Sequence, residues 1–287
     1  MTINIFKDKV CWITGASSGI GAALAQQLSK AGAYVILSAR NREQLAAVKE
    51  GSAFPWRMQL LACDMEQTDQ LETIAMEAWK MKGHIDHVFL NAGMAVRDRV
   101  IRTRPEMIRK VMDVNFMANV VITRTLLPLM IARGDGQYIV TSSLSGKFGV
   151  PQLSAYAASK HALHGFFESL RAESESQGIR VTLAVVGLVK THITLNALQG
   201  DGSRYARMEE SIARGITPER CAMKILAAAA RSDREVLVGG AEVLSVLVKR
   251  FFPSLHSWLM ARHPVRRLRS LFGAGKVLVE RPARMSA

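Results

Sequence analysis

The segment 156–160, Tyr-Ala-Ala-Ser-Lys, places a phenol and an amine four residues apart in a stretch of helical character. Residues four apart lie on one face of a helix, so Tyr156 and Lys160 can point into one site. A free tyrosine titrates near pH ~10 and a nearby cation stabilises its phenolate, so we expect Lys160 to lower the pKa of Tyr156 and make it a general acid or base. By itself, the same spacing also occurs in helices that carry only a surface pair.

Two further hydroxyls, Ser142 and Ser143, follow the short apolar segment 138–141. If that segment is a parallel strand, both serines lie at its carboxyl end, where ligands of such sheets bind. The serines and the Tyr156–Lys160 pair then share one cleft, which favours an acid–base site.

A glycine-rich turn, Thr-Gly-Ala-Ser-Ser-Gly-Ile-Gly, occupies residues 14–21 directly after the first apolar segment. Its three glycines let the backbone turn tightly and approach a pyrophosphate, which then meets the free N–H groups and positive end of the following helix. The alternative is a plain strand–helix corner, but the place of the turn between strand and helix favours dinucleotide binding. The expected contacts are Gly15, Ser17, Ser18, Gly19, Ile20 and Gly21.

Short apolar segments alternate with longer amphipathic ones along most of the chain. The expected strands are 10–14, 34–39, 58–62, 87–90, 138–141, 181–186 and 236–238. The expected helices are 21–30, 42–49, 68–81, 105–132, 155–177 and 218–230. Strands this poor in polar residues are buried on both faces, and helix-length connections require parallel crossovers. The sequence therefore predicts an α/β fold, with a doubly wound parallel sheet of the Rossmann type in three layers.

In order and spacing, the motifs between about residue 8 and about residue 240 resemble those of the short-chain dehydrogenase/reductase family, whose glycine motif is TGxxxGxG. The resemblance implies that Tyr156 is the general acid/base, that Lys160 lowers its pKa and holds the nicotinamide ribose, and that Ser143 orients the substrate oxygen. Ser143 is preferred to Ser142 because the family's serine stands thirteen residues before the tyrosine. Asn115 matches the helix asparagine that anchors a water and completes a proton relay with Lys160.

The same resemblance implies further cofactor contacts. The turn 91–93 supports the sheet and lies by the adenine ribose, Asp64 binds the adenine amino group, and Thr191 touches the carboxamide or the phosphates. The residues concerned are Asn91, Ala92, Gly93, Asp64, Met65, Val189 and Thr191. Val186-Gly187 stands where many relatives carry Pro-Gly, so we expect this loop to be less rigid.

The end of the second strand decides the type of cofactor. Enzymes that prefer NAD place an acid there to bind the ribose 2′-hydroxyl, and the acid would repel a 2′-phosphate. This chain has Ala39 at that position and then Arg40. Because a guanidinium suits phosphate, we expect NADP(H) rather than NAD(H). The alternative is that Arg40 is a solvated loop residue.

The 287 residues are 49% hydrophobic and 22% charged, enough for a full core, and carry a formal net charge of +14. From Lys249 onward nine basic residues accompany one acid, a balance of +8, which leaves 29 bases and 23 acids before it. The three cysteines, Cys11, Cys63 and Cys221, are widely spaced in apolar segments, so we expect no disulfide framework. We expect a reducing, cytoplasmic setting instead. Neither a signal peptide nor a continuous apolar span is expected.

We expect one catalytic domain over residues 1–240, with a mobile substrate lid at 192–216, and an apolar, helical and basic extension over 241–287. The apolar segment 243–260 is followed by Arg262, Arg266, Arg267 and Arg269. This pattern suits an interfacial helix on an anionic membrane, or a helix that covers the substrate cleft or a subunit interface. No recognised nucleic-acid-binding module accompanies the charge, so nucleic acid is not an expected partner.

The expected function is NADP(H)-dependent hydride transfer between nicotinamide and a carbonyl or secondary alcohol. The C-terminal region resembles that of hydroxysteroid and acyl-glycerone-type reductases, which implies a bulky apolar substrate, and the family implies a homodimer or homotetramer. The alternative is a nonenzymatic dinucleotide-binding sensor or scaffold on the same fold. No metal site is expected, because His84 and His87 lack a third ligand at useful spacing, and His161 and His164 match no required role.

Overall fold

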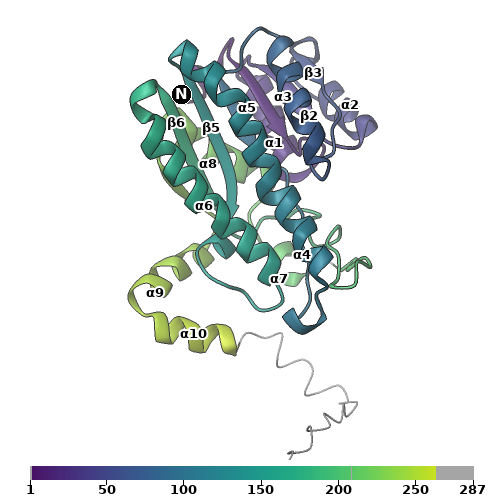
Figure 1. Cartoon of the computed structure of the whole chain (residues 1–287), viewed down its shortest axis with the longest axis vertical. Helices are drawn as coiled ribbons and strands as arrows, with labels where there is room; N and C mark the ends of the chain where they lie inside the picture. Colours follow the sequence, from purple (N-terminus) through teal and green to yellow (C-terminus); the bar gives the residue numbers. More distant parts are fainter. Residues whose placement is uncertain (1, 208, 263–287) are drawn as a thin grey trace, which may run out of the picture. The chain divides into compact units, whose positions relative to one another are not determined.

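The computed structural model describes residues 2–207 and 209–262, and Figure 1 labels its helices and strands. The chain divides into two compact units, Met1–Val246 and Leu247–Ala287. Several bases of the predicted extension lie outside the described residues, namely Arg266, Arg267, Arg269, Lys276, Arg281 and Arg284.

A seven-stranded parallel sheet forms the centre of the first unit. Its strands are β1 (Val10–Thr14), β2 (Tyr34–Ser38), β3 (Met58–Leu60), β4 (His87–Leu90), β5 (Gly136–Ser143), β6 (Ile179–Val186) and β7 (Glu235–Val238). Their spatial order is β3-β2-β1-β4-β5-β6-β7. The order reverses direction between β1 and β4, so the carboxyl ends of these strands border the crevice in which such sheets bind ligands.

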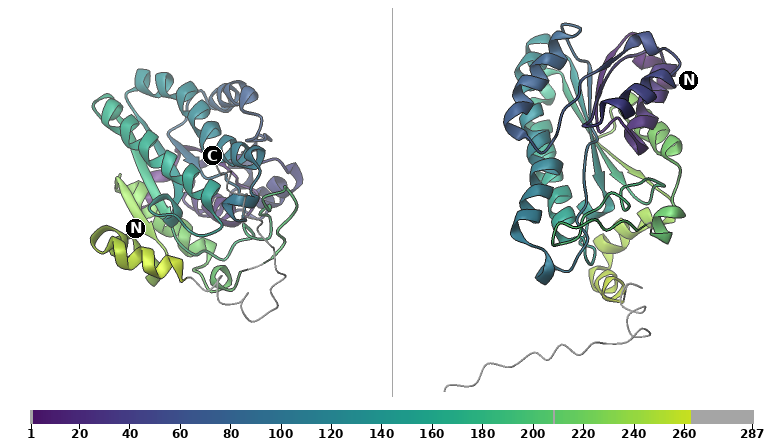
Figure 2. Two further views of the ribbon diagram at one scale, coloured as in Figure 1. Left: turned by 60° about the horizontal axis from the view of Figure 1, so that its bottom comes forward. Right: turned by 90° about the vertical axis from the view of Figure 1, so that its right-hand side faces the viewer.

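Helices cover both faces of the sheet, as the edge-on view in Figure 2 shows. One face carries α1 (Gly19–Lys30), α2 (Arg42–Glu50) and α8 (Pro218–Ala230). The other carries α3 (Leu71–Lys80), α5 (Ala118–Arg133) and α6 (Ser154–Ser174), and α4 (Pro105–Met112) leads into α5. The doubly wound fold expected from the sequence is confirmed.

Alternation along β1 shows why the strands are apolar throughout. Val10 and Trp12 pack into the cluster under α3, α5 and α6, whereas Cys11 and Ile13 pack into the cluster under α1 and α8. Successive residues of a strand point to opposite faces, so a strand covered on both sides needs apolar side chains at every position. Trp12 and the buried Thr14 are the polar exceptions, and the Trp12 indole N–H donates to Ser38 Oγ at 2.8 Å.

The strand predictions agree with the structure to within two residues at each end. β5 is longer than predicted, and Ser142 and Ser143 pair with Val185 and Val186 of β6 instead of following the strand. The helix predicted over 105–132 is interrupted by a π-helical turn, Asp113–Met117, between α4 and α5. Such turns insert one residue without disturbing the apolar pattern on either side, so periodicity does not reveal them.

One helical run among the described residues, Pro105–Arg133, is long and apolar enough to cross a membrane. Because the sequence prediction considered only uninterrupted apolar segments, it did not include this run. Its most apolar window is 44% buried, and Ile122, Leu126 and Met130 are fully enclosed in the core. Core helices also meet this criterion, so the run is weak support for a membrane span.

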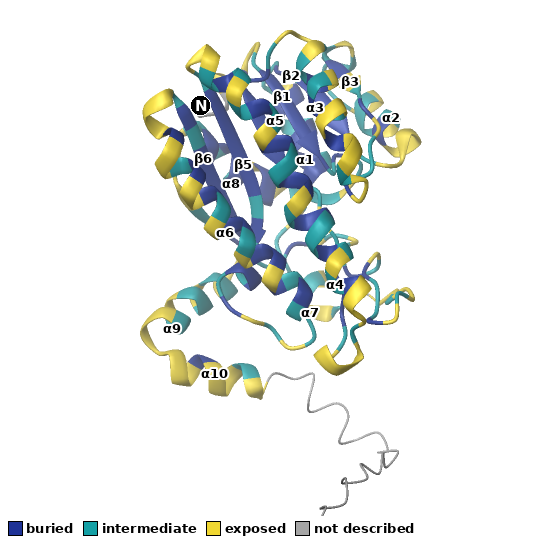
Figure 3. Ribbon diagram, viewed as in Figure 1, coloured by how far each residue is buried: buried dark blue, intermediate teal, exposed yellow. Residues whose placement is uncertain are grey.

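The described part of the second unit comprises the end of α9 (Ser245–Phe251) and α10 (Pro253–Ala261). Many of its apolar side chains are exposed, and Figure 3 shows most of α10 and the turn before it in yellow. They are Leu247, Phe251, Phe252, Leu255, Trp258 and Leu259. The Arg262 guanidinium lies 3.9 Å from the centre of the Trp258 ring, so a cation borders this apolar surface.

Candidate active site

The carboxyl ends of the neighbouring strands β1, β4 and β5 bring the predicted motifs together. Thr14 ends β1, and its Oγ1 accepts from the backbone N–H groups of Asn91 (3.0 Å) and Ala92 (3.1 Å). The Asn91 side chain donates to the Thr14 carbonyl at 3.2 Å and accepts from Thr141 on β5 at 3.3 Å. Asn91 thus joins three strand ends, which is the supporting geometry expected of the turn 91–93.

The glycine turn leaves no room for side chains. A Cβ on Gly21 would lie 2.1 Å from the Gly15 carbonyl oxygen, and one on Gly15, whose φ is +68°, would lie 2.8 Å from Ala92 Cα. Ser18 precedes α1, but its side chain makes no capping hydrogen bond. The N–H groups of the first turn of α1 are therefore available to an anion, and these residues fit a dinucleotide pyrophosphate.

Further predicted cofactor contacts lie in this turn or in the loop after β6. Ser17 and Ile20 are half-buried and Ser18 is exposed. A Cβ on Gly19 would lie only 3.1 Å from Thr191 Cγ2, so Thr191 lies directly over the turn. Val189 is 4% exposed and forms a β-bridge with Ile216, so its side chain faces the protein interior.

Tyr156 and Lys160 lie in the first two turns of α6 and share one site, as predicted. The Lys160 ammonium donates to the Thr141 carbonyl at 2.8 Å and lies 5.7 Å from the centre of the Tyr156 ring. Lys160 is 4% exposed, and this burial lowers its pKa to about 8. The site therefore holds a cation that burial disfavours.

The pKa of Tyr156 differs from the sequence prediction. Burial raises it above the usual tyrosine value, and a side-chain hydrogen bond with Ser143 lowers it in part. The lowering by Lys160 that the sequence predicts is not seen in this arrangement, in which the ammonium hydrogen-bonds the Thr141 carbonyl. In the ligand-free chain the phenol is therefore held protonated at neutral pH.

The two serines of β5 have different surroundings. Ser143 is half-buried, and its side chain forms a hydrogen bond with that of Tyr156. Its Oγ also accepts from the Ser145 N–H at 3.1 Å. Ser142 is 2% exposed, and its Oγ lies 2.9 Å from His164 Nε2 on α6. The geometry therefore places Ser143, the serine chosen from its spacing, beside the tyrosine.

Asn115 is fully buried in the π-helical turn that precedes α5. Its Oδ1 accepts from the Met94 N–H at 2.8 Å, and its Nδ2 donates to the Met94 carbonyl at 2.9 Å and to Ser159 Oγ at 3.0 Å. A Cβ on the exposed Gly93 would lie 3.3 Å from Asn115 Oδ1 and 3.6 Å from Lys160 Nζ. Asn115 thus links the loop after β4 to α6, and both Asn115 and Lys160 lie next to Gly93.

The residues predicted to meet the adenosine half lie beside β2 and β3. Arg40 is exposed after β2, next to Asn41, whose side chain caps α2 by accepting from the Gln44 N–H at 2.7 Å. Asp64 is half-buried and accepts from the Glu66 N–H at 3.0 Å. Met65 is 6% exposed and packs into the core, so only its backbone is available to a ligand.

An ion pair that the sequence analysis missed fastens the segment 192–216. Arg97, after β4, pairs with Glu209 at 2.7 Å, and their side chains are 8% and 21% exposed. Leu198 accepts from the Arg97 N–H at 2.8 Å and donates to the Ala95 carbonyl at 3.0 Å. Apart from the short helix α7 (Glu210–Ala213), the described part of the segment is irregular. These partners are far apart in the sequence, so no local pattern could have revealed them.

Histidines were considered as metal ligands. His84 lies 3.4 Å from Asp86, whereas His87 is buried against Gln137, so the two have separate partners. His164 Nδ1 lies 3.5 Å from Glu168 and 3.6 Å from Glu235. That cluster could hold an ion, but Lys147 already pairs with Glu235 at 2.5 Å and supplies a cation.

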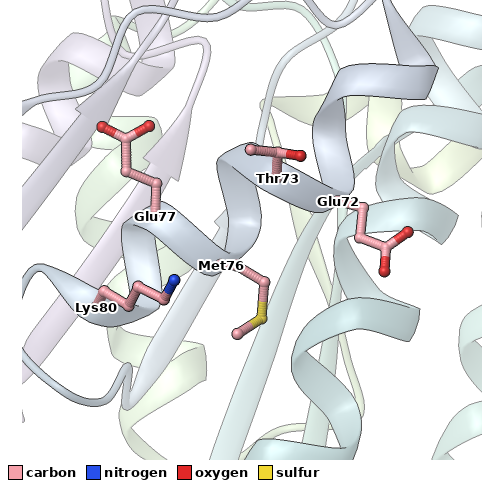
Figure 4. A pocket seen from close by; sticks show the side chains of 5 residues that line it. All are labelled: Glu72, Thr73, Met76, Glu77 and Lys80. Carbon is pink, nitrogen blue, oxygen red and sulfur yellow. The ribbon is translucent and has the colours of Figure 1, made fainter.

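Two surface depressions lie away from the predicted site residues. Figure 4 shows one of about 420 Å³ on α3, lined by Glu72, Thr73, Met76, Glu77 and Lys80. Another, of about 200 Å³, lies between α5 and α6 and includes Leu127 and Phe166. None of the predicted site residues lines either depression.

Comparison with known proteins gives consistent similarities. The family model described as short chain dehydrogenase matches residues 9–201. The chain is 35% identical to Dehydrogenase/reductase SDR family protein 7-like of Drosophila melanogaster over 271 residues, covering 92% of this chain and 82% of the relative. It is 36% identical to Dehydrogenase/reductase SDR family member 7B of Bos taurus, covering 89% and 81% of the two chains.

Solved structures share the fold. A short chain dehydrogenase/reductase from Burkholderia phymatum in complex with NAD matches with a TM-score of 0.76 and 22% identity, covering 87% of this chain and 95% of the other. A short-chain dehydrogenase from Streptomyces avermitilis matches with a TM-score of 0.73 and 26% identity, covering 91% and 98%.

Proposed function

The chain belongs to the short-chain dehydrogenase/reductase family of oxidoreductases, and on this premise we propose that it transfers hydride between NADP(H) and a carbonyl or secondary alcohol of a bulky apolar molecule. The observation that carries the proposal is the joint placement of Ser143, Tyr156 and Lys160 at the carboxyl end of β5. Asn115, bonded to the loop after β4 and to Ser159, completes the set.

Tyr156 is the general acid when a carbonyl is reduced. When NADPH is bound, its dihydronicotinamide ring would supply the hydride to the carbonyl carbon, and the carbonyl oxygen would gain negative charge. Tyr156 donates its proton to that oxygen and Ser143 donates a hydrogen bond to it, which yields the alcohol. In oxidation the tyrosine accepts the proton instead. Its raised pKa in the ligand-free chain keeps the proton in place for the reductive direction.

Lys160 stabilises the phenolate that remains after Tyr156 has given up its proton. With a pKa of about 8, its ammonium is mostly charged at pH 7. Gly93 leaves space beside Asn115 Oδ1 and Lys160 Nζ, where a ribose hydroxyl or a water can accept a hydrogen bond from Lys160 and donate one to Asn115 Oδ1. The position of Asn115 therefore supports its assignment to the proton relay.

The preference for NADP(H) is supported by Arg40. It is exposed at the end of β2, no acid stands at Ala39, and a guanidinium can bind a 2′-phosphate with two parallel hydrogen bonds. The pyrophosphate is assigned to the glycine turn and Thr191, and the adenine to Asp64.

The segment 192–216 is proposed as the substrate lid. It joins the loop after β4 through the Val96–Leu198 bridge and the Arg97–Glu209 pair. Val96 and Ala197 are buried near these two contacts, and Met94 and Leu198 pack against the cluster that includes Val96, so apolar side chains line the junction between the segment and the loop. That character supports a bulky apolar substrate.

Turnover of NADPH tests the proposal. Its absorbance would be followed with a panel of ketones from small aliphatic to steroid- and lipid-sized, with NADH as the control cofactor. We expect oxidation of NADPH that increases with the apolar bulk of the ketone. The competing function is a nonenzymatic sensor or scaffold. In that case NADPH should bind tightly, no ketone in the panel should oxidise it, and no corresponding alcohol should reduce NADP⁺.

We also propose that the chain forms a homodimer or homotetramer through α5 and α6. Met117 is 39% exposed, and the depression between these helices contains Leu127 and Phe166. Light scattering coupled to size-exclusion chromatography measures the mass of the particle, and a monomer at micromolar concentration would contradict the proposal.

The second unit is proposed to bind an anionic membrane surface from the cytoplasmic side. Six large apolar side chains of residues 247–262 are exposed, and the bases Lys249, Arg250 and Arg262 lie in the same stretch. Apolar burial together with attraction to anionic lipids is the usual basis of peripheral attachment.

A further inference from the structure

The loop 187–191, which was expected to be loose, is fixed by a residue from another part of the chain. Glu242 follows β7 in the short helical turn Ala241–Leu244. Its Oε1 accepts from the Leu188 N–H at 3.0 Å and from the Gly240 N–H at 2.9 Å. One carboxylate oxygen therefore ties the start of the loop after β6 to the turn after β7.

Three glycines make room for this carboxylate. A Cβ on Gly187 or on Gly239 would lie 2.5 Å from Glu242 Oε1, and one on Gly240 would lie 2.8 Å from Oε2. None of the three has a positive φ. A side chain at Gly187 or Gly239 would therefore have to displace the Glu242 carboxylate.

The electrostatic surroundings favour the ionised carboxylate. Partial burial raises the pKa of Glu242. The backbone N–H donors and the nearby Lys224 together lower it by more, so the net shift of the pKa is downward. Lys224 itself donates to the Gly239 carbonyl at 3.2 Å. Glu242 is therefore a fixed anion at neutral pH, and hydrogen bonds to a charged acceptor are stronger than those to a neutral one.

The other side of the loop is also fastened. The Leu188 carbonyl accepts from the Ile216 N–H at 3.0 Å, and the Lys190 N–H donates to the Ile216 carbonyl at 2.9 Å. At the end of the loop, Thr191 lies over Gly19 of the glycine turn. Glu242 thus holds Leu188, near the start of a loop whose last residue, Thr191, lies over the glycine turn.

We propose that Glu242 is a positioning residue, which holds the loop 187–191 over the glycine turn and so sets the affinity for the nicotinamide half of the dinucleotide. The inference rests on the proposed function, because it assumes that the turn binds a dinucleotide. It predicts an effect on intact NADP⁺ that is absent for 2′,5′-ADP, since that fragment lacks the nicotinamide half.

The experiment compares binding of NADP⁺ and of 2′,5′-ADP to the full chain by isothermal titration calorimetry. Glu242→Ala should weaken NADP⁺ binding by about 10-fold, the loss of one charge-assisted hydrogen bond. Binding of 2′,5′-ADP should change by less than about twofold, within the usual range of a surface substitution. Glu242→Gln keeps an acceptor oxygen and should recover most of the affinity, and Glu219→Ala removes an exposed carboxylate from α8 as the matched control.

Gly187→Ala tests the same contact with Glu242 in place. Its Cβ would displace the carboxylate, so it should reproduce the selective loss for NADP⁺ even if Glu242→Ala does not fold. In a Glu242→Ala background that does fold, Gly187→Ala should add little. Equal losses for both ligands, or unchanged NADP⁺ affinity in Gly187→Ala and Glu242→Ala, would overturn the inference. If the unaltered chain binds neither ligand, it is instead the proposed function that fails.

Discussion

Tyr156 forms a side-chain hydrogen bond with Ser143, whereas the adjacent Ser142 is enclosed and lies 2.9 Å from His164. Helix α6 provides both partners, with Tyr156 in its first turn and His164 two turns later. Ser143 is the more accessible hydroxyl, because Ser142 is only 2% exposed. Two neighbouring serines of one strand therefore have different surroundings: Ser143 lies beside Tyr156, and Ser142 is packed against His164.

The first prediction concerns this pair. Ser143→Ala should reduce kcat/KM for a ketone by about 10²-fold, because a hydrogen bond to the developing oxyanion is lost. Ser142→Ala is the matched control, with the same atom removed one residue away, and should keep kcat/KM within a few-fold. Steady-state kinetics with NADPH measure both. A larger loss of kcat/KM in Ser142→Ala than in Ser143→Ala would show that the role belongs to Ser142.

Arg40 should determine the choice between cofactors. Arg40→Ala should weaken NADPH binding by about 10- to 100-fold, the value of hydrogen bonds to a charged group, and leave NADH binding unchanged. Fluorescence titration with each cofactor gives the ratio of dissociation constants.

The control for charge is Arg109→Ala on α4, whose side chain is 74% exposed. An Arg40→Ala variant with an unaltered NADPH to NADH ratio would mean that the guanidinium is only a solvated loop charge.

Acid should destabilise the fold through His87. Burial lowers the pKa of this histidine to about 4, whereas in the unfolded chain it is near its usual value of 6.5. Between these values the unfolded chain binds more protons, so stability falls as the pH drops from about 6.5 toward 4. The contribution is about 2 kcal/mol between pH 7 and pH 5.

Urea unfolding at these two pH values measures the effect. His87→Gln removes the titrating group and keeps a hydrogen-bonding side chain next to Gln137, so its stability should change less between pH 7 and pH 5. The same pH dependence in both proteins would show that other groups, such as the buried Asp86, account for the loss.

The proposed membrane attachment would depend on the exposed apolar side chains of the second unit. Replacing Phe251, Phe252 and Trp258 with serine should reduce binding to vesicles that contain anionic lipid by more than about tenfold, because each buried side chain contributes about 1.5–3 kcal/mol. Flotation with and without phosphatidylserine measures it.

The control is Trp56→Ser with Ile101→Ser, which removes side chains that are 75% and 90% exposed in the first unit. Vesicle binding that survives the triple replacement would assign the apolar surface to another partner. Removing the second unit by truncation would test the same surface. The shortened chain should end after Val246 and not at Gly240, because it then keeps Glu242 and its contact with Leu188.

The sequence predicted the sheet well because strands buried on both faces are apolar at nearly every position, as β1 is. The acid–base pair and the glycine turn were also predictable, since each depends on local spacing. Three features were not: the π-helical turn at Asn115, the Arg97–Glu209 pair, and the Glu242–Leu188 contact. The first is a one-residue insertion that leaves the apolar pattern intact, and the others join segments that only the completed fold brings together.

The expected lowering of the Tyr156 pKa by Lys160 was the other difference between the sequence prediction and the structure. Spacing on a helix indicates that Tyr156 and Lys160 share a face, but it gives neither the burial of the ammonium nor its bond to Thr141. Burial shifts both pKa values toward the neutral forms, so a lowered tyrosine pKa is not a property of the ligand-free chain.

Turnover by Tyr156→Phe tests the central claim most directly. The substitution removes one oxygen atom, and with it the proton donor, from the proposed site. We predict that ketone-dependent NADPH oxidation falls by at least about 10²-fold while the dissociation constant for NADPH stays within about twofold. Turnover equal to that of the unaltered chain, at unchanged NADPH affinity, would contradict the assignment of Tyr156 as the general acid.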